Sequence, residues 1–197
     1  MYQLIIFLLG IPAIMVATTI HEFTRAAVST ALGDSLPKER GRLTLNPLKH
    51  FEPIGLILML ACGFGWGKPV ETSGLRYKNR NRGVLLTAIL PTAANLVFAF
   101  VFMFLASAVS NIVLLSSFFV RIAYYCCCLV VYNFIPVEPM DCVKVLSVLM
   151  PANTYFKFIQ YEKMIQMIFL LLLFFGLSGF FVGIADTLYY GIAAVVL

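Results

Sequence analysis

Long apolar runs are the feature that most limits how this chain can fold. Crossing the hydrocarbon core of a membrane as a helix takes about twenty mostly apolar residues. Four stretches meet this requirement: residues 2–32, 84–106, 112–134 and 165–184. The 197-residue chain is 61% hydrophobic and only 12% charged, whereas soluble domains carry about 25% charged residues. The sequence therefore predicts an all-α polytopic membrane protein with about four transmembrane helices, in one domain over residues 1–197.

A shorter apolar run, Pro53–Trp66, predicts a re-entrant element that enters the membrane and returns. It has only about fourteen residues, too few to span the hydrocarbon. Basic segments flank it on both sides, and such segments favour the cytosolic side of a membrane. The run ends in glycines that permit a chain reversal: Gly63, Gly65 and Gly67. Beside it, Arg42–Leu45 and Val70–Tyr77 predict a short extended or sheet segment.

The positive charges predict the orientation of the chain. The net charge of +5 is modest and is explained by basic cytosolic loops, so we expect the lipid bilayer and no nucleic acid as a partner. The loops concerned are residues 38–49 and 76–82. With both in the cytosol, the first helix runs inward, and His21 and Asp141 both lie near the cytosolic side.

A His and a Glu stand side by side at the end of the first apolar run. His21 and Glu22 are costly to bury there, and such residues usually mark a site. The pattern is one residue short of His-Glu-x-x-His, in which two histidines on one helix face hold Zn²⁺ and the Glu is a general base. Position 25 is Arg, which has no lone pair to coordinate a metal.

A second polar stretch runs from Asn133 to Asp141. Two prolines within it, Pro136 and Pro139, unwind the end of the preceding helix and free backbone carbonyl groups. Unwound backbone at membrane depth is tolerated where it lines a cavity. A carboxylate placed there can meet a site on another helix, so Asp141 is a candidate partner of His21.

Three motifs in this order resemble those of the site-2 protease family of intramembrane zinc metalloproteases. They are His21-Glu22-x-x-Arg25, Pro91-Thr-Ala-Ala-Asn95-Leu and Asn133-x-x-Pro136-x-x-Pro139-x-Asp141. The loop from Gly41 to Pro53 is also similar to that of small bacterial members. The resemblance implies one site-2-protease-like domain in the bacterial cytoplasmic membrane.

The resemblance also implies roles for individual residues. His21 and Asp141 would be metal ligands for a zinc cofactor, and Glu22 would be the catalytic base that deprotonates a zinc-bound water. Asn95 and Asn133 would bind the substrate, a transmembrane segment of a client protein. Because Arg25 stands at a ligand position, the resemblance to a zinc metalloendopeptidase comes with an expectation of lost or altered activity.

Three hypotheses follow. In the first, the chain is a catalytically impaired homologue: Arg25 occupies the space of the metal, and the fold still binds transmembrane client helices. In the second, an active enzyme recruits Cys142 or His50 as the missing ligand. In the third, the chain is a channel or transporter that uses Arg121 and Asp186, unless these two are structural partners of each other or of Glu138.

Overall fold

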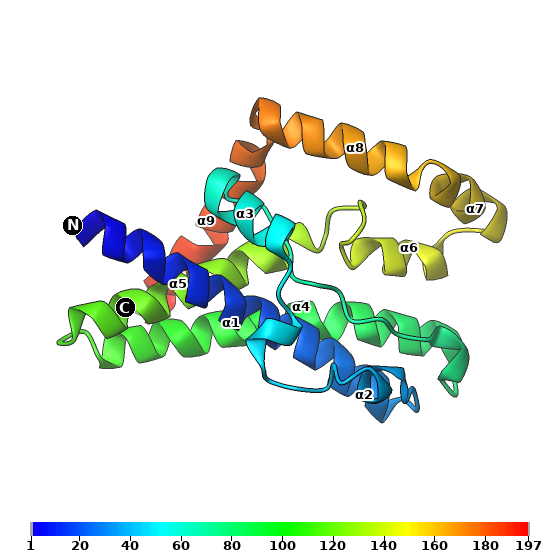
Figure 1. Cartoon of the computed structure of the whole chain (residues 1–197), viewed down its shortest axis with the longest axis horizontal. Coiled ribbons are helices and arrows are strands. Elements are labelled where there is room, and N and C mark those ends of the chain that lie inside the picture. Colours follow the sequence, from blue (N-terminus) through cyan, green and yellow to red (C-terminus); the bar gives the residue numbers. More distant parts are fainter. Residues whose placement is uncertain (1, 197) are drawn as a thin grey trace.

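The predicted apolar runs form helices, as Figure 1 shows for this computed structural model. The structure describes residues 2–196, so the two ends of the predicted domain, Met1 and Leu197, lie outside the described residues. Four apolar helical segments in this range are long enough to cross a membrane. They comprise α1 (Tyr2–Ala31), α4 (Arg80–Ala108), α5 (Val113–Tyr132) and the continuous run of α8 (Glu162–Leu172) and α9 (Ser178–Val196). The protein is therefore an all-α integral membrane protein.

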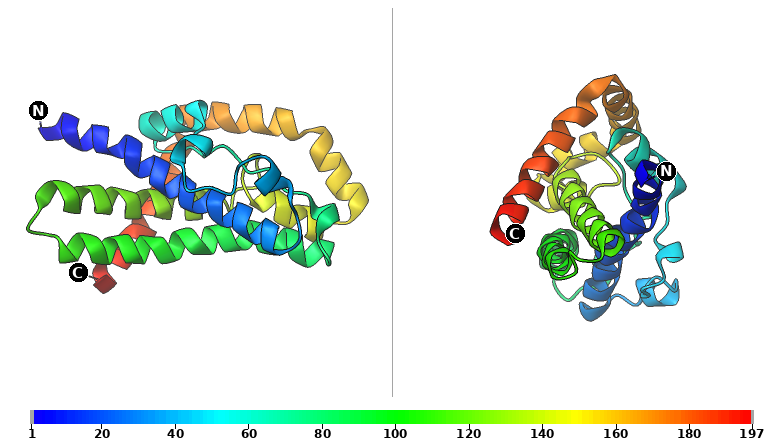
Figure 2. Two further views of the ribbon diagram at one scale, coloured as in Figure 1. Left: turned by 60° about the horizontal axis from the view of Figure 1, so that its bottom comes forward. Right: turned by 90° about the vertical axis from the view of Figure 1, so that its left-hand side faces the viewer.

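Helices α1, α4 and α5 pack against one another along their lengths and form the core, and α9 crosses α5 and α4 (Figures 1 and 2). Small residues at their contacts allow the helices to approach closely. The fully buried small side chains of these helices include Ala13, Ala17, Ala99, Ala123, Cys126, Cys128 and Ala185. The cysteines are free thiols within this packing, as is the neighbouring Cys127.

The short run Pro53–Trp66 folds back on itself, as a re-entrant element requires. Helix α3 (Pro53–Cys62) ends at Gly63, whose φ of +75° favours glycine. The hydroxyl of Tyr132 on α5 donates to the Gly63 carbonyl, and the Phe64 ring packs 4.4 Å from the Tyr132 ring. The chain then returns to its starting point, where the Lys68 amide donates to the His50 carbonyl (2.9 Å).

The two predicted extended segments are wrong as strands, because residues 2–196 contain none. In the first, turn chemistry overrides the alternation: the Thr44 carbonyl pairs with the His50 ring (2.8 Å), next to a 3₁₀ turn at Pro47–Lys49. In the second, residues 70–77 are irregular chain with a 3₁₀ turn at Gly74–Arg76. The Val70 amide donates to the carboxylate of Glu22 and the Ser73 amide to that of Asp34, so neither pairs with a neighbouring strand.

The last predicted span, residues 165–184, is interrupted rather than straight. A π-helical turn at Leu173–Leu177 separates α8 from α9, and Gly176 has a φ of +110°. The chain changes direction sharply there (Figure 1). Hydropathy could not reveal this break, because the run around it is apolar except for Ser178.

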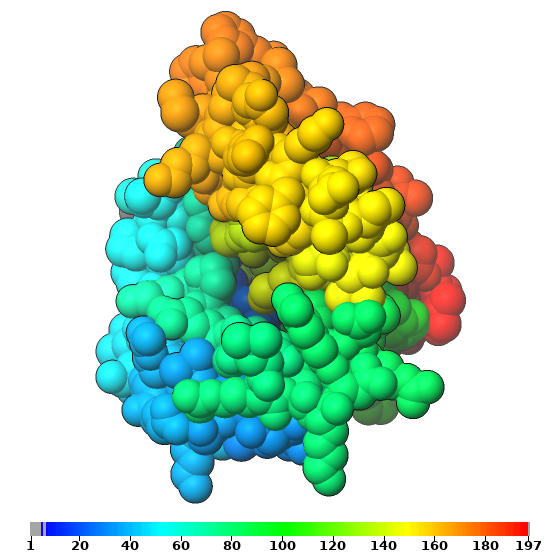
Figure 3. Space-filling model, turned by 90° about the vertical axis from the view of Figure 1, so that its right-hand side faces the viewer, coloured from blue at the N-terminus to red at the C-terminus, as the bar shows by residue number. Residues whose placement is uncertain are grey.

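The remaining short helices lie at one end of the molecule. They are α2 (Leu36–Glu39), α6 (Cys142–Leu149) and α7 (Ala152–Gln160). The end of α1 and the start of α4 reach the same end, on the right of Figure 1 and facing the viewer in Figure 3. The basic segment at residues 76–82 and the start of the one at residues 38–49 lie at this end, and the rest of the latter runs back toward the middle of the molecule (Figure 1).

We expect Gly65→Ala to destabilise the re-entrant hairpin. A Cβ at Gly65 would overlap the carbonyl oxygen of Gly55 and lie 2.9 Å from the Cβ of Met59. Overpacking of this kind costs about 1–3 kcal/mol, which lowers the melting temperature by roughly 2–12 °C in a chain of this size. Thermal unfolding in detergent measures it. Gly183→Ala is the control, since nothing lies within 4 Å of a Cβ there; equal effects would contradict the prediction.

Candidate functional site

Arg25 is the centre of the site. Its side chain is fully buried, with 1% of its surface exposed. One terminal nitrogen, Nη1, donates to both carboxylate oxygens of Glu22, at 2.9 and 2.8 Å. The other, Nη2, donates to Oδ1 of Asp141 at 2.7 Å. The guanidinium thus joins a carboxylate one helical turn away on α1 to a carboxylate 116 positions later in the chain.

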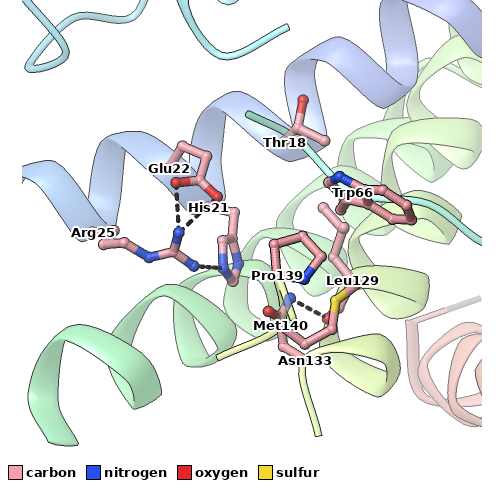
Figure 4. A pocket seen from close by; sticks show the side chains of 10 residues that line it. Thr18, His21, Glu22, Arg25, Trp66, Leu129, Asn133, Pro139 and Met140 are labelled. Atoms are coloured by element: carbon pink, nitrogen blue, oxygen red, sulfur yellow. Dashed lines mark hydrogen bonds and ion pairs between the residues drawn. The ribbon is translucent and has the colours of Figure 1, made fainter. Parts of the chain in front are cut away.

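His21 completes this cluster on the same helix face (Figure 4). Its Nε2 lies 3.0 Å from Oδ2 of Asp141 and 2.9 Å from Nη2 of Arg25. The amide nitrogen of Asn95, on α4, is 3.3 Å from Nδ1. When that amide donates to Nδ1, the ring proton is on Nε2 and is donated to Asp141. The Asn95 side-chain oxygen is buried and has no hydrogen-bond partner among the described residues.

Asp141 is held in place by the turn between α5 and α6. The side chain of Asn133, at the end of α5, accepts from the Asp141 amide (3.1 Å) and donates to the Leu129 carbonyl (2.8 Å). The two prolines of this segment end α5 and let the chain turn toward α1. Asn133 therefore positions the carboxylate; its expected contact with a substrate stays a prediction.

Lys144 is a member of the site that the sequence analysis did not identify. Its Nζ lies 3.1 Å from Oδ1 of Asp141, three residues earlier. Burial alone would raise the pKa of Asp141, but the charges of Arg25 and Lys144 and the hydrogen bond from His21 outweigh burial and hold that pKa well below its ordinary value. The sequence signal for Lys144 was its position three residues after Asp141, which places the two side chains on the same face at the start of α6.

A backbone group also contacts the site. The Val70 amide donates to Oε2 of Glu22 at 2.7 Å, so the chain between the hairpin and α4 crosses the site. A backbone donor carries no residue-type signal, which is why sequence reasoning missed it. A cavity of about 10 Å³, room for one water molecule, lies beside His21 and Glu22, with Thr18, Trp66 and Gly67 among its other walls (Figure 4).

The residues present do not fit a zinc ion. The two expected ligands, His21 and Asp141, bond each other directly, and the fixed positive charge of Arg25 lies against both. A catalytic zinc site usually has three protein ligands. Within residues 2–196, no three His, Cys, Asp or Glu side chains are arranged to hold a metal, so neither His50 nor Cys142 completes such a set.

An apolar groove of about 410 Å³ leads from the outside of the bundle to this cluster. Asp141 and Asn133 form part of its wall, and exposed side chains such as Ile89 and Phe134 form its mouth. Its other lining residues come from α4, α5 and α6: Ala88, Thr92, Ala93, Leu96, Val130, Cys142 and Val145.

Arg121 and Asp186 do not belong to this cluster. Neither makes an ion pair with the other or with Glu138 among the charged groups that the structure describes, so the expected structural pairing is wrong. The structure contributes no observation in favour of an ion pathway through these residues.

The fold and the cluster describe an integral membrane protein with a buried ionic cluster between α1 and the turn before α6. The chain is 31% identical over 168 residues to the Bacillus subtilis (strain 168) protein described as "Putative zinc metalloprotease YwhC", with 81% of this chain and 77% of that protein aligned. This chain therefore belongs to the same metalloprotease family. No family model matches it, and no solved structure matches it significantly.

Arg25→Met should destabilise the protein strongly at neutral pH. Removing the guanidinium leaves the carboxylates of Glu22 and Asp141 buried without their main partner, which costs about 3–5 kcal/mol. Thermal unfolding in detergent measures this. Arg40→Met is the matched control, because its ion pair with Glu71 is exposed (57% and 63%) and contributes little. Equal losses would contradict a special role for Arg25.

The cost of Arg25→Met should shrink as the pH falls. A carboxyl whose folded pKa is depressed stabilises the fold above its ordinary pKa, about 3.9 for Asp, and loses this effect as the pH falls toward the folded value. Without Arg25 that pKa rises, so protonation of Asp141 relieves the unpaired charge. The measurement is the melting temperature of the unmodified protein and of Arg25→Met between pH 4 and 8. A difference in melting temperature that stays the same at every pH would contradict the prediction.

Proposed function

We propose that this protein is a catalytically impaired, site-2-protease-like member of its metalloprotease family, which binds transmembrane helices of client proteins. The observation that carries the proposal is the guanidinium of Arg25, which contacts His21, Glu22 and Asp141 at 2.7–2.9 Å. It lies among the side chains that the family resemblance assigns to the metal and to the base. We place the site at the cytosolic side of a bacterial cytoplasmic membrane, in keeping with the basic segments at that end.

The state of Glu22 supports impaired catalysis. A general base must be free to accept a proton from a water molecule within hydrogen-bond reach. Both oxygens of Glu22 already accept from Arg25, and one also accepts from the Val70 amide. These bonds would have to break or lengthen before Glu22 could take a proton. No observation favours Cys142 or His50 as a substitute metal ligand.

The apolar groove supports the binding of a membrane helix or an unwound part of one. Its wall is almost wholly apolar, as suits a segment that enters from lipid, and it ends at polar groups. Asn95 precedes the lining residue Leu96 in α4, and its fully buried side-chain oxygen has no hydrogen-bond partner among the described residues, so a client backbone amide would bond it once neighbouring side chains move aside. A buried acceptor that lacks a partner is costly, so such a bond would contribute to binding.

Zinc content tests the metal part of the proposal. We expect less than 0.1 zinc per chain, by elemental mass spectrometry, in the purified unmodified protein; the Arg25→His variant should approach one. Arg25→Met, which removes the charge without adding a ligand, and Arg25→His combined with His21→Ala are the controls and should stay near zero. Stoichiometric zinc in the unmodified protein, lost in His21→Ala, would overturn the proposal.

Photo-cross-linking tests client binding. A photoreactive amino acid at Ala93, in the groove, should capture a labelled single-span peptide in lipid vesicles, and excess unlabelled peptide should compete. The same group at Phe174, which is 84% exposed and far from the groove lining, is the control and should give several-fold less adduct. Equal, non-competed capture at both positions would mean that the groove has no affinity for helices.

A further inference from the structure

A second polar cavity lies at the loops around α2 and the return of the hairpin, separate from the Arg25 cluster. It measures about 290 Å³ and is lined by Arg40, Arg42, Leu48, Lys49, Lys68 and Glu71. Four cations face one carboxylate, and that carboxylate is bonded by Arg40 at 3.1 Å. The cavity therefore has a formal excess of three positive charges. Neither Lys49 nor Lys68 makes an ion pair with any residue that the structure describes.

Arg42 is incompletely satisfied within this cavity. Its terminal nitrogen Nη2 donates to the Lys68 carbonyl (2.6 Å), but its Nε is buried and has no hydrogen-bond partner in residues 2–196. Burial lowers the pKa of this side chain, because the nearby carboxylates do not compensate its charge. An anion in the cavity would supply the missing negative charge beside this guanidinium.

The backbone holds these cations in a fixed frame. The Asn46 side chain caps the 3₁₀ turn that carries Lys49 by accepting from the Leu48 amide (3.1 Å). The Lys68 amide donates to the His50 carbonyl (2.9 Å), which ties the return of the hairpin to this turn. The cations therefore need little reordering to meet a ligand, and binding loses less entropy.

The segment that carries Lys49 and the start of α3 expose several apolar side chains. Leu45 and Leu48 are 67% and 70% exposed, and Ile54 and Ile57 on α3 are 61% and 63% exposed. Leu48 itself lines the cavity. In a membrane protein such side chains lie in the apolar part of the bilayer, so the cations beside them lie at the level of lipid head groups.

We propose that this cavity binds a phosphate-bearing anion supplied by the head group of an anionic phospholipid. Arg40, Lys49 and Lys68 neutralise the phosphate, Arg42 adds a fourth positive charge to the lining, and Leu48 contacts the start of an acyl chain. A bound lipid would link the loop after α2 to the end of the hairpin, just before the segment whose Val70 amide contacts Glu22. This assignment stands independently of whether the protein is catalytically impaired.

The test measures lipid binding to the full chain by native mass spectrometry in detergent, with phosphatidylglycerol, phosphatidylcholine and inorganic phosphate as probes. The cavity variant combines Arg40→Gln, Lys49→Gln and Lys68→Gln and leaves the bracing Arg42 intact. The matched control combines Lys78→Gln, Arg80→Gln and Arg82→Gln, which removes the same charge from the start of α4. A third variant, Glu71→Gln, removes the one carboxylate at an exposed position.

Phosphatidylglycerol should bind the unmodified protein at least tenfold more tightly than phosphatidylcholine. Each removed charge should lower the affinity for phosphatidylglycerol roughly fivefold, so the cavity variant should bind it on the order of a hundredfold more weakly than the unmodified protein. The affinity of the control variant should stay within a few fold of the unmodified protein. Glu71→Gln should bind about fivefold more tightly. Binding of inorganic phosphate without binding of phosphatidylglycerol would overturn the lipid as the ligand and assign the site to the free ion. Equal losses in cavity and control variants, or no lipid preference, would overturn the proposal.

Discussion

The buried guanidinium of Arg25 is the interaction on which the rest of the candidate site depends. Two carboxylates, Glu22 and Asp141, lie at less than 5% exposure inside a membrane protein, where an unpaired charge is very costly. Arg25 pairs with both, and Lys144 adds a second cation at Asp141. The two cations balance the two carboxylates, which makes the burial of the cluster tolerable.

This balance of charge also explains how the fold can exist without a metal. A divalent zinc bound beside two carboxylates would bring two positive charges, and Arg25 and Lys144 together bring the same number. A zinc ion added to the present cluster would instead create a buried excess of positive charge, in addition to the steric conflict with the guanidinium. The substitution at position 25 and the lysine on α6 therefore act together, and neither alone replaces the charge of the ion.

Much of this arrangement was predictable from the sequence, for reasons that differ among its parts. The spans follow from hydropathy, and the pairing of Arg25 with Glu22 follows from helical periodicity. The prediction that Asp141 and His21 lie at the same depth needed only the in-and-out alternation of the spans and the positions of the basic loops. The strand predictions failed because short loop segments satisfy their amides with side chains and turns, which alternation does not reveal. The kink at Gly176 and the Val70 contact depend on tertiary packing and a backbone donor, which leave no pattern in the residue types.

The groove and the ionic cluster place different demands on the protein, and this separates binding from catalysis. The groove depends on the packing of α4 against α5 and α6, which Asn133 stabilises by holding the turn before α6. None of these contacts requires a metal. Arg25 and Lys144 compensate the carboxylates of Glu22 and Asp141 with covalently attached charges. Under the proposed function, these covalently attached cations take the place of the ion, so the shape of the groove does not depend on metal supply and the vacant coordination position that hydrolysis needs is lost.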